Sequence, residues 1–284
     1  MIPACEICDS RICPDGFTVG IYPVSEKMET VQKEKSMKKI AIYGKGGIGK
    51  STITSSLAAA CAMQGYRVMQ IGCDPKADSS INLLNGKKLI TVMDYLREND
   101  EEPELEDIVV EGYAGVLCIE AGGPIPGQGC AGRGIITTFT ILKELEAIEV
   151  YRPDVIFFDV LGDVVCGGFA APIRENYADE IIIVTSGEKM ALYAANNIYR
   201  AVQSFQDRGY ASAKGIILNS RNVKEEERLV QEFADQAGLP VLLKVPRDEN
   251  IQIYEEQNMT VLQGDQNLEI SRLFLDFAKR LMEE

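Results

Sequence analysis

The sequence contains no histidine, and its apolar residues form no long uninterrupted run. The lack of histidine excludes Ser-His-Asp chemistry, His-ligated zinc, histidine proton shuttles and His-ligated haem. No apolar run approaches the roughly 18 residues that a membrane span needs, and the N-terminus lacks a basic region followed by an apolar stretch. We therefore expect a cytoplasmic protein without membrane contact, whose reactivity comes from Cys, carboxylates, Lys, Arg or a cofactor.

Basic residues are scarce: 29 Lys and Arg stand against 43 Asp and Glu, and the net charge is −14. Binding to nucleic acid would need clustered Lys and Arg to meet the phosphates, so we expect no nucleic-acid partner. A docking partner would instead be a protein with basic patches. The eight cysteines occur without a secretion signal, and we expect them to be thiols or metal ligands rather than a disulfide framework.

Residues 1–36 differ from the rest of the chain, because they carry Cys5, Cys8 and Cys13 among early turn-forming Pro and Gly residues and then a charged stretch. We interpret them as an appended tail. A flexible reduced tail, a metal or cluster site, and upstream sequence translated from a misassigned start are the alternatives. The C-x2-C-x4-C spacing has no local fourth ligand and does not decide between them. Residues 37–284 are predicted to form one domain.

Short apolar runs predict strands at residues 40–43, 68–71, 115–119, 155–158, 180–185, 215–218 and 240–245. Helical stretches separate most of these runs, the first at about 50–64 and the last at 268–282. Strands that are buried on both faces and joined by helices form a mostly parallel sheet covered on each side, so the pattern predicts a doubly wound α/β fold. Ligands in such folds bind beyond the carboxyl ends of the strands.

The first predicted strand leads into the glycine-rich segment G-K-G-G-I-G-K-S, which matches G-x-x-x-x-G-K-[ST] and precedes a predicted helix. Backbone N–H groups of this loop would surround the phosphates of a nucleotide, Lys50 would reach the β- and γ-phosphates, and Ser51 would bind Mg²⁺. The alternative is a glycine turn with an incidental lysine. The predicted nucleotide-binding residues here are Gly44, Lys45, Gly46, Gly47, Ile48, Gly49, Lys50, Ser51 and Thr52.

Three further side chains follow predicted strands. Asp159 closes the strand at 155–158, where a carboxylate can hold Mg²⁺ through water or orient an attacking water. Cys130 and Cys166 each lie in a glycine-rich segment after a predicted strand. Two thiolates cannot complete the four-Cys shell of a 4Fe-4S cluster, whereas a symmetric dimer supplies four. Taken by themselves, two such cysteines would also fit inert thiols.

Four motifs together resemble the nitrogenase iron protein family, which includes the reductase components of nitrogenase-like enzymes. They are D-P-K-A-D-S from Asp74, G-C-A-G-R-G around Cys130, D-V-L-G-D-V-V-C-G-G-F from Asp159, and N-S-R-N from Asn219. The motifs occur in the family's order and together cover most of residues 38 to about 280. The resemblance implies a P-loop NTPase fold of the deviant Walker A type. It also implies an ATP-hydrolysing reductase that passes single electrons from a 4Fe-4S cluster, shared by a homodimer, to a catalytic partner.

The resemblance assigns roles to individual residues. Cys130 and Cys166 would be the cluster ligands, two from each subunit, and Lys45 would reach across the dimer to the partner's nucleotide. Lys45 could also be an exposed loop lysine. Asp74 and Asp78 would form a first nucleotide-sensing segment. Asp163 would belong to a second one, close in sequence to Asp159 and Cys166.

The remaining implications concern the edges of the site and the partners. Arg133 would lie on the docking face, where some family members accept ADP-ribose, although an isolated Arg is more often a solvated charge. Asn219, Pro246, Arg247 and Asp248 resemble the family's adenine-side contacts. A ferredoxin or flavodoxin would be the electron donor.

The pathway is less well marked than the family. The chain ends soon after its last predicted helix, which resembles the nitrogenase-like reductases, so we favour a nitrogenase-like partner over nitrogen fixation itself. The sequence of the reductase gives little indication of whether that partner reduces dinitrogen, a tetrapyrrole or a methylthio-alkane. Two other functions remain as alternatives: a deviant Walker A ATPase that positions cargo or partitions DNA, which needs no paired cluster cysteines, and a scaffold that transfers its iron-sulfur cluster to other proteins.

Overall fold

The computed structural model describes residues 37–284, apart from 125–130, 163–169, 175–176 and 207–209. These residues form an eight-stranded sheet in the order β3-β4-β2-β5-β1-β6-β7-β8. Its strands are β1 (Lys38–Gly44), β2 (Val68–Gly72), β3 (Val110–Glu111), β4 (Leu117–Glu120), β5 (Val155–Asp159), β6 (Glu180–Thr185), β7 (Ser212–Asn219) and β8 (Val241–Val245). All neighbouring strands pair in parallel except β3 and β4, which confirms the predicted fold class. The antiparallel β3 was not predicted, because its two residues are both exposed and form no apolar run.

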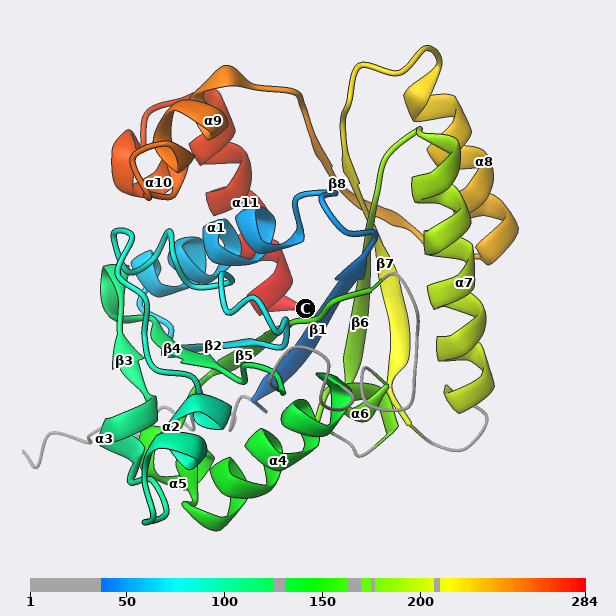
Figure 1. The fold of residues 1–284 in the computed structure, drawn as a ribbon. Helices are drawn as coiled ribbons and strands as arrows, with labels where there is room; N and C mark the ends of the chain where they lie inside the picture. Colours follow the sequence, from blue (N-terminus) through cyan, green and yellow to red (C-terminus); the bar gives the residue numbers. More distant parts are fainter. Residues whose placement is uncertain (1–36, 125–130, 163–169, 175–176, 207–209) are drawn as a thin grey trace, which may run out of the picture. The chain divides into compact units, whose positions relative to one another are not determined.

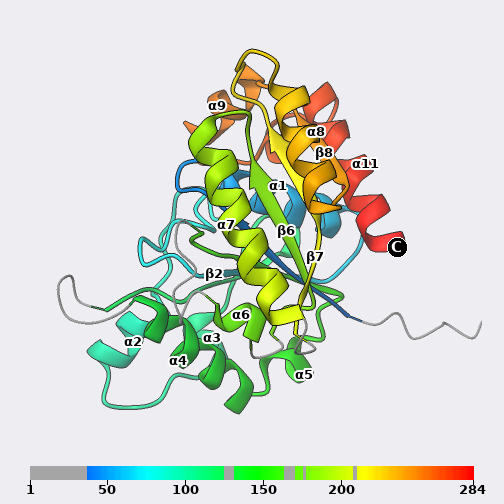
Figure 2. The same cartoon turned by 90° about the vertical axis from the view of Figure 1, so that its right-hand side faces the viewer.

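Helices connect the strands in the order of the chain. They are α1 (Lys50–Met63), α2 (Val92–Glu98), α3 (Leu105–Ile108), α4 (Ala131–Glu144), α5 (Ala147–Tyr151), α6 (Ala171–Arg174), α7 (Lys189–Gln206), α8 (Glu226–Ala237), α9 (Glu249–Glu255), α10 (Val261–Gly264) and α11 (Glu269–Glu283), together with the 3₁₀ helix η1 (Tyr113–Gly115). Figure 1 shows α1 and α11 lying together beside the sheet. Figure 2 shows α7 lying along β6 and β7.

The alternation of side chains along β1 explains why the sheet has helices on both faces. Ile40 and Ile42 belong to the core that includes α1 and α11, whereas Ala41 and Tyr43 belong to the core that includes α4 and α7. All four side chains are fully buried. Successive side chains of a strand point to opposite faces, so a strand that is apolar at every position must be covered twice.

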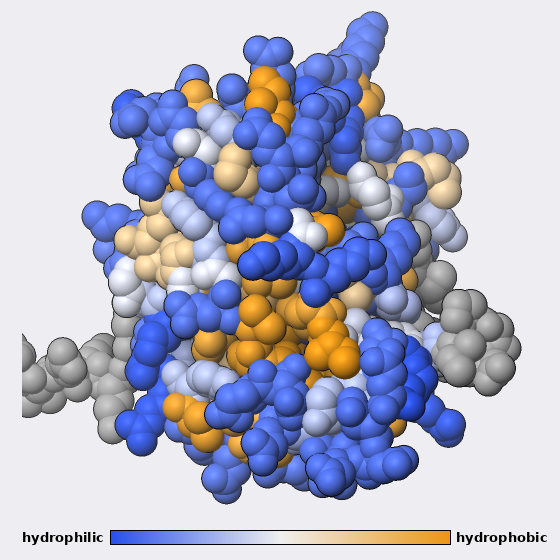
Figure 3. Space-filling model, turned by 60° about the vertical axis from the view of Figure 1, so that its left-hand side comes forward, coloured by the Kyte–Doolittle hydropathy of each residue, from blue (hydrophilic) through white to orange (hydrophobic). Residues whose placement is uncertain are grey.

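The surface of the described part is mostly polar. Figure 3 shows a group of apolar side chains near the middle of one face, with hydrophilic side chains around it. Among the described helices, none has both the length and the apolar character that crossing a membrane requires.

The ends of three neighbouring strands lie in register at one edge of the sheet. Gly72, the last residue of β2, pairs with Glu120 of β4 on one side and with Asp159 of β5 on the other. Asp159 also pairs with Ile42 of β1, the strand that leads into the glycine-rich loop. Because the strands are parallel, this edge collects the segments that follow β1, β2, β4 and β5.

Candidate functional site

The glycine-rich loop has the strand–loop–helix setting that its sequence predicted. Gly47 and Gly49 have φ angles of +72° and +96°, in the left-handed region where a Cβ is unfavourable. Gly49 immediately precedes α1, and a Cβ there would lie 2.5 Å from the Asn219 side-chain nitrogen. The N–H of Ile48 donates to the Lys45 carbonyl at 3.1 Å. The loop therefore needs its glycines, and it lies at the positive end of a helix of 14 residues.

The predicted residues Lys50, Ser51 and Asp159 lie close together at the phosphate end of this site. Lys50 is 8% exposed and Asp159 is 2% exposed. Burial raises the pKa of Asp159, while the Lys50 ammonium and then the Ser51 and Ser79 hydroxyls act to lower that pKa. The Ser79 hydroxyl donates to Oδ2 of Asp159 at 2.7 Å. The sequence reasoning did not assign Ser79 this contact.

The second oxygen of Asp159 is available for a ligand. Its Oδ1 is buried and has no hydrogen-bond partner among the residues that the structure describes, although the Ser51 hydroxyl is close enough to affect the pKa of the carboxylate. An unpartnered buried oxygen is costly, by about 1–3 kcal/mol, unless something else satisfies it. A carboxylate oxygen beside a serine hydroxyl is a donor set that suits Mg²⁺ or its bound water. Ser51 and Asp159 therefore fit a magnesium ion held with a nucleotide.

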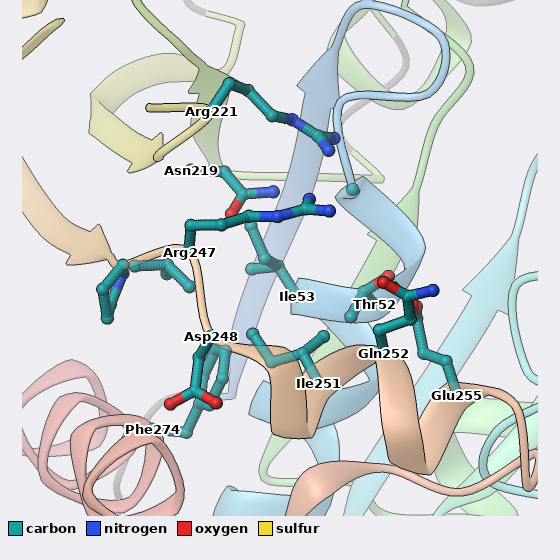
Figure 4. Close-up of a pocket in the computed structure, with 13 residues that line it drawn as sticks. Thr52, Ile53, Asn219, Arg221, Arg247, Asp248, Ile251, Gln252, Glu255 and Phe274 are labelled. Carbon is teal, nitrogen blue, oxygen red and sulfur yellow. Dashed lines mark hydrogen bonds between the residues drawn. The ribbon is translucent and has the colours of Figure 1, made fainter. Parts of the chain in front are cut away.

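A cavity of about 340 Å³ opens beside the loop, and the predicted adenine-side residues line it. Figure 4 shows Asn219, Arg221 and Arg247 extending toward the first turn of α1. Asn219 donates to the carbonyl of Ile48 at 2.7 Å, and Arg221 donates to the carbonyl of Gly47 at 2.7 Å. The lining residues are Gly49, Thr52, Ile53, Asn219, Arg221, Val245, Pro246, Arg247, Asp248, Ile251, Gln252, Glu255 and Phe274.

The sequence reasoning missed the contribution of α9 and α11 to this cavity. Gln252 and Glu255 of α9 lie beside Thr52 of α1, and the Thr52 hydroxyl donates to the Glu255 carboxylate. Phe274 of α11 also lines the cavity. No spacing rule links a helix near residue 250 with one near residue 50, so only the tertiary structure reveals this wall. The one usable signal was Asp248, whose side chain accepts from the Asn250 N–H at 2.8 Å and caps α9.

The two carboxylates that follow β2 have different environments. Asp74 is half-buried, accepts a hydrogen bond from the Lys76 N–H at 3.0 Å and acts to raise the pKa of Asp159. Asp78 is exposed and acts to raise the pKa of Glu120. Ser79, the residue after Asp78, makes the direct contact with Asp159. The segment thus approaches the phosphate site, with a serine rather than an aspartate at the point of contact.

The predicted cluster ligands Cys130 and Cys166, together with Asp163, lie outside the described residues. Two described glycines that precede them in the sequence, Gly162 and Gly123, lie close to the nucleotide-binding residues. A Cβ on Gly162 would lie 2.6 Å from the Gly44 carbonyl oxygen. A Cβ on Gly123 would lie 2.6 Å from the Pro75 Cβ. The backbone at Gly162 therefore packs directly against the phosphate loop, and the backbone at Gly123 packs against the segment after β2.

The structure also describes Lys45, Arg133 and three of the other cysteines. Lys45 is half-buried in the loop, and Arg133 is exposed in the first turn of α4. Cys61, Cys73 and Cys118 are buried free thiols that belong to the apolar core. Burial raises the pKa of Cys61 and of Cys118 to about 12, so neither is a ready thiolate. Cys5, Cys8 and Cys13 lie outside the described residues.

Comparison with known proteins decides the family. Residues 38–284 match the family described as 4Fe-4S iron sulfur cluster binding proteins, NifH/frxC family. The chain belongs to this family. It is 50% identical over 249 residues to the nitrogenase iron protein of Methanospirillum hungatei, covering 87% of this chain and 88% of that protein. It is 46% identical over 259 residues to nitrogenase iron protein 2 of Methanothermococcus thermolithotrophicus, covering 87% and 89%.

Membership in the NifH/frxC family fixes the general activity. The chain is an ATP-dependent reductase of this family's type, and the cofactors of the family are a 4Fe-4S cluster and MgATP. The nucleotide half of that cofactor set agrees with the fit of Lys50, Ser51 and Asp159 described above. The family match starts at residue 38, while the role of residues 1–36 stays a prediction.

Solved structures support the fold of this family member. The MinD cell division protein of Aquifex aeolicus superposes with a TM-score of 0.66 and 21% identity, covering 87% of this chain and 97% of that chain. The cell division ATPase MinD of Pyrococcus furiosus gives a TM-score of 0.68 at 19% identity, covering 87% and 99%. At this identity the likeness shows a P-loop NTPase fold alone, and it does not favour the cargo-positioning alternative.

Proposed function

We propose that two copies of this chain hold one 4Fe-4S cluster through Cys130 and Cys166 of each copy. MgATP bound at the glycine-rich loop is hydrolysed as single electrons pass from the cluster to a catalytic partner. The partner is a nitrogenase or nitrogenase-like protein, in keeping with the names of the two relatives. A ferredoxin or flavodoxin is the electron donor, and Arg133 lies on the surface that docks with the partner.

The observation that carries this proposal is the packing of Gly162 on Gly44. The segment that contains Asp163 and Cys166 starts where its backbone touches the phosphate loop, so no side chain separates the two. A displacement near the γ-phosphate would pass into that segment by direct contact. The contact of Gly123 with Pro75 supports a second connection, from the segment of Asp74 and Asp78 toward Cys130.

The residues of the nucleotide site have distinct roles in this proposal. Lys50 and the loop N–H groups bind the phosphates, Ser51 and Asp159 hold Mg²⁺ or its water, and Lys45 reaches the partner's nucleotide. When bound, the cluster supplies the transferable electron. Four thiolates, two from each chain, would satisfy it, and a cluster so held would lie on the two-fold axis of the dimer.

Iron content and EPR spectra of anaerobically purified protein test the ligand assignment. We expect one 4Fe-4S cluster per two chains, with loss of its reduced-state EPR signal in Cys130→Ser and in Cys166→Ser. Cys61→Ser and Cys118→Ser are matched controls, because these free thiols are buried within α1 and β4 and are not proposed ligands. A full signal in either ligand variant would refute the assignment. Iron that moves completely to an acceptor apoprotein would favour a scaffold instead.

A further inference from the structure

A buried polar network covers the ends of β4, β2 and β5, and Glu120 is the part of it that the activity described above does not use. Glu120 is the last residue of β4 and is 1% exposed. Its Oε1 accepts two hydrogen bonds from Ser80, at 2.8 Å from the backbone N–H and at 2.7 Å from the hydroxyl. Both donors approach the same oxygen, and within the described part of the chain Oε2 has no hydrogen-bond partner.

A glycine makes room for this carboxyl group. Gly72 of β2 lies in register between Glu120 and Asp159, so the two acidic side chains are separated by a position without a side chain. A Cβ on Gly72 would lie 1.8 Å from Oε2 of Glu120 and 2.8 Å from the Cβ of Ser79. The space that a side chain at residue 72 would need is therefore filled by the Glu120 carboxyl group and by the Ser79 side chain.

Ser79 connects this arrangement to the proposed magnesium ligand. Gln70 of β2 donates to the Ser79 hydroxyl oxygen at 3.0 Å, which leaves the hydroxyl hydrogen free to donate to Asp159. Gln70 also donates to the Ser79 carbonyl at 3.0 Å, and Ser55 of α1 donates to the same carbonyl at 2.9 Å. Ser79 is thus fixed from β2 and α1, and its neighbour Ser80 is fixed only from Glu120 among the side-chain contacts of the described residues.

We propose that Glu120 is a positioning residue for the cation in the nucleotide site. It holds Ser80, and so keeps Ser79 bonded to Oδ2 of Asp159, so that Oδ1 would be left to hold Mg²⁺ or its water. The chain of contacts runs from Glu120 through Ser80, Ser79 and Asp159 to the cation, so Glu120 itself does not touch nucleotide or metal. This inference rests on the nucleotide part of the proposed function and is independent of the cluster ligands.

The experiment measures how strongly a divalent cation supports nucleotide binding. ADP is titrated by calorimetry into the intact protein with Mn²⁺ and with EDTA, and the EPR spectrum of the protein-bound Mn²⁺–ADP complex is recorded. We expect Glu120→Ala and Ser80→Ala to lower the affinity for Mn²⁺–ADP by about tenfold, as is typical when a group behind a metal ligand is removed. ADP affinity in EDTA should stay unchanged, because the phosphate loop and Lys50 are intact.

Two further variants separate positioning from a general packing defect. Glu120→Gln keeps an oxygen that accepts from Ser80, so it should restore the parent Mn²⁺ effect and EPR spectrum. Ser271→Ala is the matched control, since Ser271 is a fully buried serine whose hydroxyl donates to the backbone carbonyls of Val261 and Asp265, away from this network. It should leave both titrations unchanged.

The outcomes are distinct. Parent-like Mn²⁺ support in Glu120→Ala and Ser80→Ala, or an equal loss in Ser271→Ala, would overturn the positioning role while leaving the proposed function intact. A loss of ADP affinity in EDTA equal to the loss in Mn²⁺ would also overturn it, because the defect would then not concern the cation. A parent protein that binds no ADP would overturn the nucleotide part of the proposed function and this inference with it.

Discussion

At the scale of single residues, the edge of the sheet brings together carboxyl groups whose charge is unfavourable. Glu120 and Asp159 are both nearly fully buried, and burial raises the pKa of each. The Lys50 ammonium, with the Ser51 and Ser79 hydroxyls, offsets this effect at Asp159, whereas among the described residues the hydrogen bonds from Ser80 offset it at Glu120. The pKa of Glu120 is raised to about 8, so the group carries a proton at neutral pH.

This proton predicts a pH dependence of stability. The pKa of Glu120 is raised from 4.5 to about 8, mainly by burial and also by the charges of Asp159 and Asp78, against the lowering effect of the two hydrogen bonds from Ser80. Between these two values the folded protein holds a proton that the unfolded chain has released. The free energy of unfolding should therefore fall as pH rises through this window, by at most about 1.4 kcal/mol per pH unit from this group.

Glu120→Gln lacks the titrating proton and provides the comparison. Urea unfolding of the parent and of Glu120→Gln should show the variant gaining relative stability from pH 5 to pH 8, with no further gain above that range. Glu249→Gln, at an exposed position, controls for the loss of one ionisable group. A stability difference between parent and Glu120→Gln that is the same at every pH would show that Glu120 titrates normally.

At the scale of elements, the apolar runs predicted the parallel strands well because each is buried on both faces. The run at 180–185 forms β6 with the same bounds, and the run at 155–158 forms β5, which extends to Asp159. The phosphate loop was equally predictable, since its chemistry is local: a glycine pattern between a strand and a helix. The wall from α9 was not predictable, because the seven residues of this helix give no sign of which cavity they will line.

The serine contacts were also beyond sequence reasoning, for a related reason. Ser79 is the last residue of the D-P-K-A-D-S motif, whereas Ser80 and Glu120 lie outside every motif of the sequence. Their roles depend on the order of the strands, with β2 placed between β4 and β5. Strand order follows from packing across the whole sheet, and no local pattern around Glu120 specifies it.

The contact between Gly162 and Gly44 predicts a nucleotide effect on iron release. MgATP should displace the segment of Asp163 and Cys166, so an iron chelator should remove iron severalfold faster with MgATP than with MgADP or without nucleotide. The measurement is the rate of formation of the coloured iron–chelator complex under anaerobic conditions. Asp163→Asn should reduce the difference while ATP still binds, because binding depends mainly on the loop and Lys50. Equal rates in all nucleotide states of the parent would contradict the coupling.

At the scale of the whole molecule, the proposed homodimer makes a test of Lys45 possible. If Lys45 serves the partner's nucleotide, a Lys45→Ala chain paired with a Lys50→Ala chain contains one intact site, formed by Lys50 of the first chain and Lys45 of the second. Each homodimer of a single variant has a defect in both sites. Co-expression with two different tags allows the mixed dimer to be isolated.

The mixed dimer should recover part of the MgATP effect on iron chelation, on the order of half if the two sites act independently. The two variant homodimers should show little or no MgATP effect, and their iron content should match that of the parent. A Lys45→Ala homodimer that responds like the parent would show that Lys45 is an ordinary loop lysine. A mixed dimer as inert as the homodimers would place Lys45 at its own chain's nucleotide.

The glycine between two acidic strand ends also constrains how this sequence can change over time. A Cβ at position 72 would fall 1.8 Å from Glu120, so a mutation there is tolerable only after the side chain at 120 has become shorter or smaller. Positions 72 and 120, which are 48 residues apart in the numbering, should therefore vary together among descendants of a common ancestor. A lineage that lost this glycine while keeping the glutamate would have had to rebuild the backbone around both.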